Sequence, residues 1–235
     1  MSNDTLQALI DRANGQPGEQ ILFIRPLTES VHWARAWLQA PVLHDTTAAS
    51  HGNPIYLIRD PEQQYVGIVV DMGESDLHWF VLPAQRGRHY LSTSLREVIL
   101  PHLLQNRQTQ RISISRNFGE EIFEASARVA RAAGFVLEPE SEEDEESQVT
   151  MRYTPVDWTA LPTFEGRNQP LSEERLRQLR SHFAYHANCL RVLGAEIDGR
   201  LGEADFTDHI NDLAGQVHSL GAETEDVNWE IKGRE

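Results

Sequence analysis

The stretch that decides the fold is LHWFVLPAQRGRHYLSTSLREVILPHLLQ, from Leu77 to Gln105. It opens with an apolar run that is typical of a short strand, and Pro83 ends that run. A loop follows, and then a segment that predicts an amphipathic helix, which Pro101 should kink or end. Apolar residues recur there at a three-and-four spacing that suits packing on a sheet, namely Leu91, Leu95, Val98, Ile99 and Leu103.

The loop at residues 84–90 ends at the start of this predicted helix. Unpaired backbone amides and the positive end of the helix dipole point into such a loop and favour a phosphate or a carboxylate there. Arg86 and Arg88 add positive charge in an acidic chain. The other interpretation is an ordinary connection between strand and helix with solvated arginines, and these residues alone leave both open.

The segments before this stretch predict a short helix, a first strand and a hairpin. We expect the helix at residues 3–13 and the strand at residues 21–27. Two apolar runs, at residues 55–58 and 65–70, flank a turn and predict a β-hairpin. Thr28 can cap a second helix, whose inward residues would be Val31, Trp33, Ala34, Trp37 and Leu38.

After the central stretch, the sequence predicts a strand at residues 111–115 and a helix at Glu120–Ala133 that ends at Gly134. Its inward residues would be Ile122, Phe123, Ala127 and Ala130. Residues 135–137 and 149–153 are the last predicted strands. The acidic run at residues 140–146 between them is expected to be a solvated hairpin tip.

A helical hairpin is predicted beyond residue 170. The expected division is residues 1–154 as one domain, 155–170 as a linker, 171–222 as the hairpin and 223–235 as an acidic, mobile tail. Its seam must meet either the first domain or a second copy of the chain, and the sequence leaves both open. The predicted seam consists of Leu176, Leu179, Phe183, His186, Leu190, Leu193 and Ile197, followed by Phe206, Ile210, Leu213, Val217 and Leu220.

Composition narrows the class of protein. A formal net charge of -15 over 235 residues argues against nucleic acid or an anionic membrane as a partner and suits a cationic substrate. Cys189 is the only cysteine, so no intramolecular disulfide can form and a reducing compartment is expected. With no leader-like start and no apolar run approaching about 18 residues, we expect a cytoplasmic protein without a membrane segment.

Two groups of residues suggest a metal, but we expect no metal site. His44, Asp45 and His51 share a polar loop without a further ligand at a recognised spacing. His182, His186 and Cys189 share one helical face. Because His186 falls on the predicted apolar seam, fixing the helix register is the favoured interpretation.

The order of motifs over roughly residues 20–154 resembles the GNAT superfamily of acyl-CoA-dependent N-acetyltransferases. The motifs that carry the resemblance are Val81-Leu82-Pro83, Gln85-Arg86-Gly87-Arg88, Arg111 to Ser115, Asn117, Ala133-Gly134-Phe135 and Met151-Arg152-Tyr153. The resemblance implies an α+β fold with a mixed, mostly antiparallel sheet flanked by helices, to which the C-terminal αα-hairpin is appended.

The resemblance also implies a reaction and a site. Acetyl-CoA would give its acetyl group to a small-molecule or peptide amine. Asp76, His78 and Glu121 are the candidate bases, whereas Ala130 stands where the family often has a tyrosine acid. Residues expected to contact the cofactor are Trp79, Phe80, Val81, Arg86, Gly87, Arg88, His89, Tyr90, Leu91 and Asn117.

The phosphate loop departs from the family pattern and keeps other functions open. The family places small residues where this chain has His89 and Leu91. We therefore weigh three hypotheses. The first is an N-acetyltransferase that forms a homodimer through its C-terminal helices. The second is a catalytically inactive GNAT-like binding or regulatory protein, and the third is a scaffold whose hairpin and acidic loop hold a basic partner.

Overall fold

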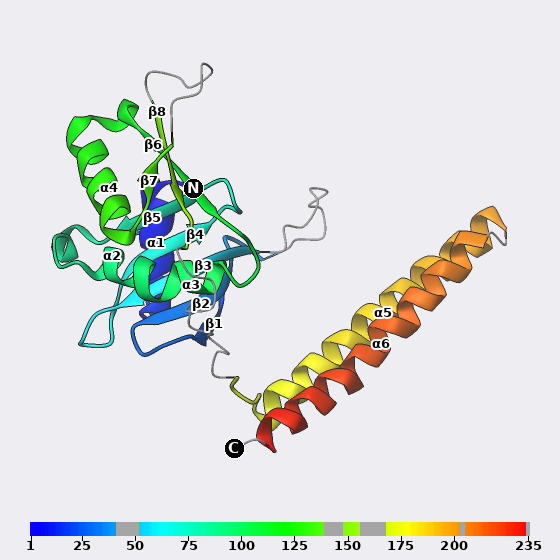
Figure 1. Cartoon of the computed structure of the whole chain (residues 1–235). Coiled ribbons are helices and arrows are strands. Elements are labelled where there is room, and N and C mark those ends of the chain that lie inside the picture. Colours follow the sequence, from blue (N-terminus) through cyan, green and yellow to red (C-terminus); the bar gives the residue numbers. More distant parts are fainter. Residues whose placement is uncertain (41–51, 139–147, 156–167, 203–204, 234–235) are drawn as a thin grey trace. The chain divides into compact units, whose positions relative to one another are not determined.

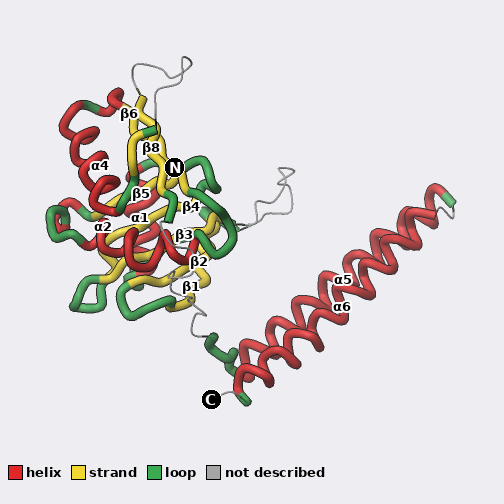
Figure 2. Tube along the Cα trace, in the orientation of Figure 1, coloured by secondary structure: helices red, strands yellow, loops and turns green. Residues whose placement is uncertain are grey.

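The computed structural model describes residues 1–40, 52–138, 148–155, 168–202 and 205–233 (Figure 1). The chain divides into two compact units, unit 1 (Met1–Arg167) and unit 2 (Asn168–Glu235). Unit 1 contains two antiparallel sheets with helices, and unit 2 is a pair of long helices (Figure 2). The predicted α+β class with a C-terminal helical pair is confirmed.

Five strands form the larger sheet of unit 1 in the order β1-β2-β3-β4-β5, and each neighbouring pair is antiparallel. β3 and β4 form the predicted hairpin. The smaller sheet has the order β6-β8-β7. The strand bounds are β1 Ile21–Pro26, β2 Val31–Trp37, β3 Asn53–Arg59, β4 Tyr65–Asp71, β5 Leu77–Val81, β6 Gln110–Ser115, β7 Val136–Leu137 and β8 Gln148–Tyr153.

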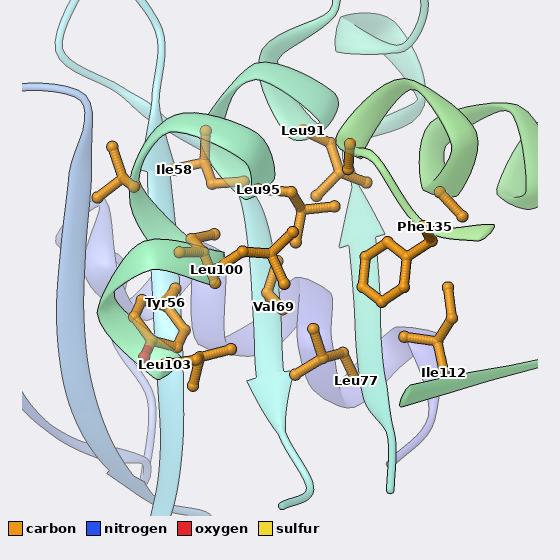
Figure 3. Close-up of a cluster of buried hydrophobic side chains, with 14 of the residues drawn as sticks. Tyr56, Ile58, Val69, Leu77, Leu91, Leu95, Leu100, Leu103, Ile112 and Phe135 are labelled. Atoms are coloured by element: carbon orange, nitrogen blue, oxygen red, sulfur yellow. The ribbon is translucent and has the colours of Figure 1, made fainter. Parts of the chain in front are cut away.

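Helices pack on both faces of the larger sheet, and its inner strands β3 and β4 are buried on two sides. Helix α1 (Asn3–Ala13) packs its apolar residues on one face, together with Ile55, Leu57 and Ile68. Because successive strand residues point to opposite faces, Tyr56 and Val69 belong to the other face. There they pack with residues of the helix that follows β5, with a residue of β6 and with the residue just before β7, including Leu91, Leu95, Leu100, Leu103, Ile112 and Phe135 (Figure 3).

The helix predicted at residues 28–38 is wrong, because this segment is strand β2. Thr28 does cap a turn, but the turn joins β1 to β2, and its hydroxyl accepts the N–H of Val31 (3.0 Å). The apolar positions among residues 31–37 fit both the period of a helix and the period of a strand. Both faces of a central strand are buried, so the β-branched and aromatic side chains at Val31, Trp33 and Trp37 fit the strand.

The helix after β5 runs through Pro101 in three consecutive segments: α2 (Tyr90–Ser94), a π-helical segment η2 (Leu95–Ile99) and α3 (Leu100–Leu103). Proline has no N–H, and its ring needs space beside the carbonyl four residues earlier. The N–H of Leu100 donates to the carbonyl of Leu95, one residue farther back than in an α-helix. This wider turn accommodates Pro101 without ending the helix.

Helix α4 (Glu120–Ala133) buries Phe123, Ala127, Ala130 and Ala133, but Ile122 is 57% exposed, so its predicted inward position is wrong. The helix ends at Gly134 as predicted, with φ at +101°. A side chain there would adopt an unfavourable backbone conformation and meet the Tyr153 ring at 3.0 Å. Gly134 thus lets the chain turn directly into β7.

Unit 2 is an antiparallel hairpin of α5 (Glu173–Leu201) and α6 (Asp205–Lys232). Ser172 caps α5 as predicted, because its hydroxyl accepts the N–H of Arg175 (3.2 Å). The tail expected from residue 223 is wrong for residues 223–232, which continue α6. Ion pairs with α5 hold this last part, between Arg180 and Glu225 (2.6 Å) and between Glu173 and Lys232 (2.5 Å).

The predicted seam of this hairpin is also partly wrong. Small or polar residues form the buried contact, whereas several predicted seam residues are exposed. Helices approach closely where side chains are small: a Cβ on Gly194 would lie 3.5 Å from Ile210, and one on Gly221 would lie 3.6 Å from Arg180. His186 is exposed, so it does not fix the register within the hairpin. The fully buried or nearly buried seam residues are Leu176, Ala187, Gly194, Thr207, Ala214, Gly221 and Asn228.

Three sequence-based predictions lie outside the described residues. They concern the polar loop with His44, Asp45 and His51, the acidic run at residues 140–146, and most of the linker, at residues 156–167.

Candidate functional site

The outer edge of β5 carries backbone amides without a strand partner. The N–H of Leu82, just after β5, donates to the carbonyl of Val66 on β4 (3.0 Å). Because consecutive strand residues direct their N–H groups to opposite sides, Phe80 also faces β4, whereas Trp79 and Val81 face the other edge. Within the described part of the chain no strand pairs with that edge. The amides of Trp79 and Val81 are therefore available to an acceptor on a ligand.

Strand β6 is part of the smaller sheet, but its first half also forms hydrogen bonds with the residues just before β5. The N–H of Arg111 donates to the carbonyl of Glu74 (2.9 Å). Oδ1 of Asp76 accepts the N–H of Ser113 (3.1 Å) and the N–H of Leu77 (2.9 Å). The two segments thus run in the same direction where they touch. Asp76, predicted as a candidate base, ties the start of β5 to β6.

A second polar cluster fixes the same end of the two strands. Arg107 forms a bidentate ion pair with Asp71 at the end of β4 (2.7 and 3.0 Å). It also donates to Oε1 of Gln110 (2.6 Å) and to the carbonyl of Gly73 (3.0 Å). Gln110 is fully buried, and its amide group donates to the carbonyls of Gly73 and Glu74. The turn between β4 and β5 is therefore anchored to the first residue of β6.

The loop after β5 folds back on the strand. Pro83–Gln85 form a 3-10 turn, and Nε of Arg86 donates to the carbonyl of Val81 (3.2 Å). Gly87 and His89 both have positive φ, at 78° and 64°. Helix α2 begins directly after His89, and no side chain caps its first turn. Arg86 and Arg88, which are both exposed, precede this helix start in the chain, and the guanidinium of Arg86 lies over the Phe80 ring.

His89 and Leu91 stand where the family pattern has small residues, and their side chains differ in burial. Leu91 is 6% exposed and belongs to the core between α2 and the sheet. Tyr90 is half-buried and packs against the same core. His89 is exposed. The left-handed conformation of His89 is uncommon for a residue other than glycine, and it directs the chain into the helix.

His78 lies on the face of β5 that carries Phe80 and packs on α1. Burial lowers the pKa of His78 below its ordinary value, the chain's amino terminus acts in the same direction, and Asp76 opposes it. Its imidazole has no hydrogen-bond partner among the described residues. Burial raises the pKa of Asp76, against the two amides that it accepts. His78 is thus a neutral imidazole at neutral pH with a free nitrogen lone pair.

Glu121 and Asn117 lie after β6 and not on β5. Asn117 is in the 3-10 turn Arg116–Phe118, where its N–H donates to Oγ of Ser115 (3.1 Å). Glu121 is exposed in the first turn of α4. The structure gives neither residue a contact with the free edge of β5, so the strand and loop residues are the ones it brings together.

Several residues of this site were missed by sequence reasoning. Asp71, Arg107, Gln110 and Ser113 hold the ends of β5 and β6, yet they lie up to 42 positions apart in the sequence. No motif links them. One signal was present: Arg107 and Gln110 immediately precede a predicted strand, and polar residues at such a boundary often bond to neighbouring backbone.

Among the residues that the structure describes, no group of three or more His, Cys, Asp or Glu side chains is placed to hold a metal ion. No helix in the same part of the chain is both long enough and apolar enough to cross a membrane.

Comparison with known proteins finds similarity at the level of structure alone. No protein-family model and no curated protein matches the sequence. An acetyltransferase from Agrobacterium tumefaciens is 18% identical over 45% of this chain and 63% of its own, with a TM-score of 0.34. The matched region thus spans less than two thirds of that protein.

Two further solved structures are similar over longer parts of their own chains. A proposed acyl-CoA N-acyltransferase from Klebsiella pneumoniae is 15% identical over 48% of this chain and 79% of its own, with a TM-score of 0.31. A proposed phosphinothricin N-acetyltransferase is 10% identical over 64% of this chain and 88% of its own, with a TM-score of 0.34. Within unit 1, antiparallel strands lead into a strand, a loop and a helix, which is the order of elements that the sequence resemblance implies.

Proposed function

We propose that the chain is a GNAT-like N-acetyltransferase that moves an acetyl group from acetyl-CoA to an amine. One arrangement carries this proposal: two unpaired amides on β5 are followed at once by an uncapped helix start with two arginines. The amides of β5 can donate hydrogen bonds to carbonyl groups of an extended ligand. The amides at the helix start, together with Arg86 and Arg88, can bind phosphate groups. Acetyl-CoA has both parts in this order.

The residues present fit such a cofactor. Leu91 faces the core, so its side chain does not fill the loop. A Cβ on Gly87 would meet nothing within 4 Å, which leaves the loop backbone accessible. Oε1 of Gln85, in the loop, is buried without a hydrogen-bond partner among the described residues, so it can accept a donor from a ligand. Trp79, Phe80 and Val81 would line the chain of the cofactor, and residues 86–91 its phosphates.

The chemistry needs few groups from the protein. Bound acetyl-CoA supplies an activated thioester whose carbonyl carbon accepts the amine nitrogen, with the thiolate as the leaving group. The outward amides of β5 can donate to the carbonyl oxygen as it gains negative charge. A nearby base accepts the proton from the amine. Ala130 is fully buried in the core, so α4 supplies no acid there, and the thiolate takes its proton from elsewhere.

Of the three candidate bases we favour His78. It is adjacent to Trp79 on β5, and its lowered pKa keeps the imidazole neutral. Asp76 is engaged by two backbone amides, so we assign it a positioning role. Glu121 remains a candidate base and Asn117 a candidate cofactor contact, both on the side of α4. The acidic chain suits a cationic acceptor, either a small amine or a peptide amine, and argues against nucleic acid as a partner.

Calorimetric titration of the full chain with acetyl-CoA tests the proposal. We expect saturable binding with a dissociation constant in the micromolar range, and release of free thiol when a suitable amine is added. An absence of heat at high micromolar acetyl-CoA would count against both binding and catalysis.

A GNAT-like binding or regulatory protein without turnover is the second candidate. The buried alanine at position 130, where the family often has its acid, favours it. Binding of acetyl-CoA without thiol release in the presence of any of a panel of primary amines would support this function. Turnover with a single amine would exclude it.

A further inference from the structure

One side of the helical hairpin of unit 2 carries a row of large apolar side chains. On α6 these residues are 41% to 55% exposed and lie seven positions apart. Such regular spacing places them on a single line along the helix. Scattered apolar residues on a surface are ordinary, but a continuous row is not. The row consists of Phe206, Leu213, Leu220 and Val227.

Helix α5 contributes to the same side. Leu179, His186 and Leu193 are also seven apart, and each precedes a seam position by one residue, as the row on α6 does. In an antiparallel helix pair, positions just before the seam on each helix flank the same side of the pair. The two rows therefore form one surface, which we call the apolar side of the hairpin.

The other side of the hairpin is polar. Its residues lie three positions before the seam on each helix. They are mainly charged or polar, and they include the Arg180–Glu225 ion pair at the edge of the seam (2.6 Å). If water covered both sides of the hairpin, we would expect both sides to be polar. The flanking residues are Arg177, Ala184, Arg191 and Asp198 on α5, and Asn211, His218, Glu225 and Lys232 on α6.

We propose that the apolar side binds the same side of a second copy of the chain, so that two hairpins form a four-helix bundle. The row from Phe206 to Val227 is about 32 Å long at 1.5 Å per residue. The longest described helix of unit 1, α4, has 14 residues and already buries its apolar stripe in the core. A second hairpin matches the row in length, in heptad spacing and in apolar character.

Charge favours the same partner and suggests its arrangement. Helix α5 carries five arginines beside four acidic residues, whereas α6 between residues 206 and 232 has a single basic residue, Lys232, beside six acidic residues. A bundle in which α5 faces α6 of the other copy places opposite charges at its edges. The acidic residues are Asp208, Asp212, Glu223, Glu225, Asp226 and Glu230.

Sedimentation equilibrium of the full chain tests the dimer. We expect the wild-type protein to have twice the chain mass of 26.7 kDa at micromolar concentration. Leu220→Glu should raise the dimer dissociation constant about 100-fold or more, because it places a charge in the apolar contact. His218→Glu makes a similar change on the polar side of the same helix and should leave the mass unchanged.

His186→Leu shows whether the effect of Leu220→Glu comes from a lost dimer contact or from a misfolded hairpin. Replacing this polar residue within the apolar side should lower the dissociation constant, and a misfolded hairpin cannot produce tighter association. A monomeric wild-type chain at 100 micromolar, or equal dissociation constants for all four proteins, would overturn the proposal. The test does not depend on acyl transfer, so either proposal can fail alone.

Discussion

Asp76 lies just before β5 and His78 lies on it, yet their surroundings suit these two residues to different roles. Two backbone amides hold Asp76 in place between the strands. His78 on the α1 face is half-buried, with its pKa lowered by burial. Sequence reasoning could name both as titratable groups near the central strand. It could not separate them, because the amide of Ser113 that engages Asp76 comes from a distant segment.

We expect His78→Gln to lower kcat/KM about 100-fold, in the range usual for loss of a general base. A base must be deprotonated to act, so wild-type activity should rise with pH through the pKa of His78. Since burial lowers that pKa from 6.5, the midpoint of the rise should lie below 6.5. The pH profile of kcat/KM measures both effects, and His182→Gln on exposed α5 is the control. A wild-type profile retained in His78→Gln would exclude this role.

Arg88→Gln should weaken acetyl-CoA binding about tenfold, because an exposed arginine at a helix start contributes charge to phosphate binding. Arg96→Gln removes an exposed arginine from within the helix that follows, and its ion pair with Glu97 lies on the surface. Calorimetric titration should give that variant the wild-type dissociation constant. Equal weakening in both variants would indicate a general charge effect in place of a local site.

At the level of elements, the central stretch was the part best predicted from sequence. The strand, the loop and the helix from Leu77 to Leu103 occur as expected, because one period of apolar residues fits each segment. Strand β2 was mispredicted because residues 31–37 are apolar on both faces, and period alone cannot then distinguish a strand from a helix. The seam of α5 and α6 was displaced because small residues allow close approach, which a count of large apolar residues overlooks.

The cluster around Arg107 should be a major source of stability for the β5 and β6 ends. Arg107→Met leaves the mostly buried carboxylate of Asp71 without its partner, and we expect a loss of about 3 kcal/mol in the free energy of unfolding. Urea unfolding followed by tryptophan fluorescence measures it. Arg111→Gln removes a more exposed ion pair with Glu138 and should cost less than about 1 kcal/mol. Similar losses in the two variants would contradict the importance of the buried pair.

For the whole molecule, the two units should respond differently to protein concentration. The proposed dimer contact involves the hairpin and would stabilise α5 and α6 by mass action. In scanning calorimetry, the Tm of the helical transition should rise by several degrees between about 5 and 500 micromolar chain, and the transition of unit 1 should stay constant. Leu220→Glu should remove the concentration dependence. A parallel shift of both transitions would show that the units are coupled.

The open side of β5 also bears on the behaviour of the chain without a ligand. Exposed strand borders invite pairing with other polypeptides, and proteins commonly protect them with proline or with charge. Here Pro83 and the guanidinium of Arg86 stand at one end of the short segment, and β6 occupies the other. Among the described residues, two amides at this edge have no strand partner. A small molecule can use them, whereas an invading peptide would find too few backbone groups to pair with.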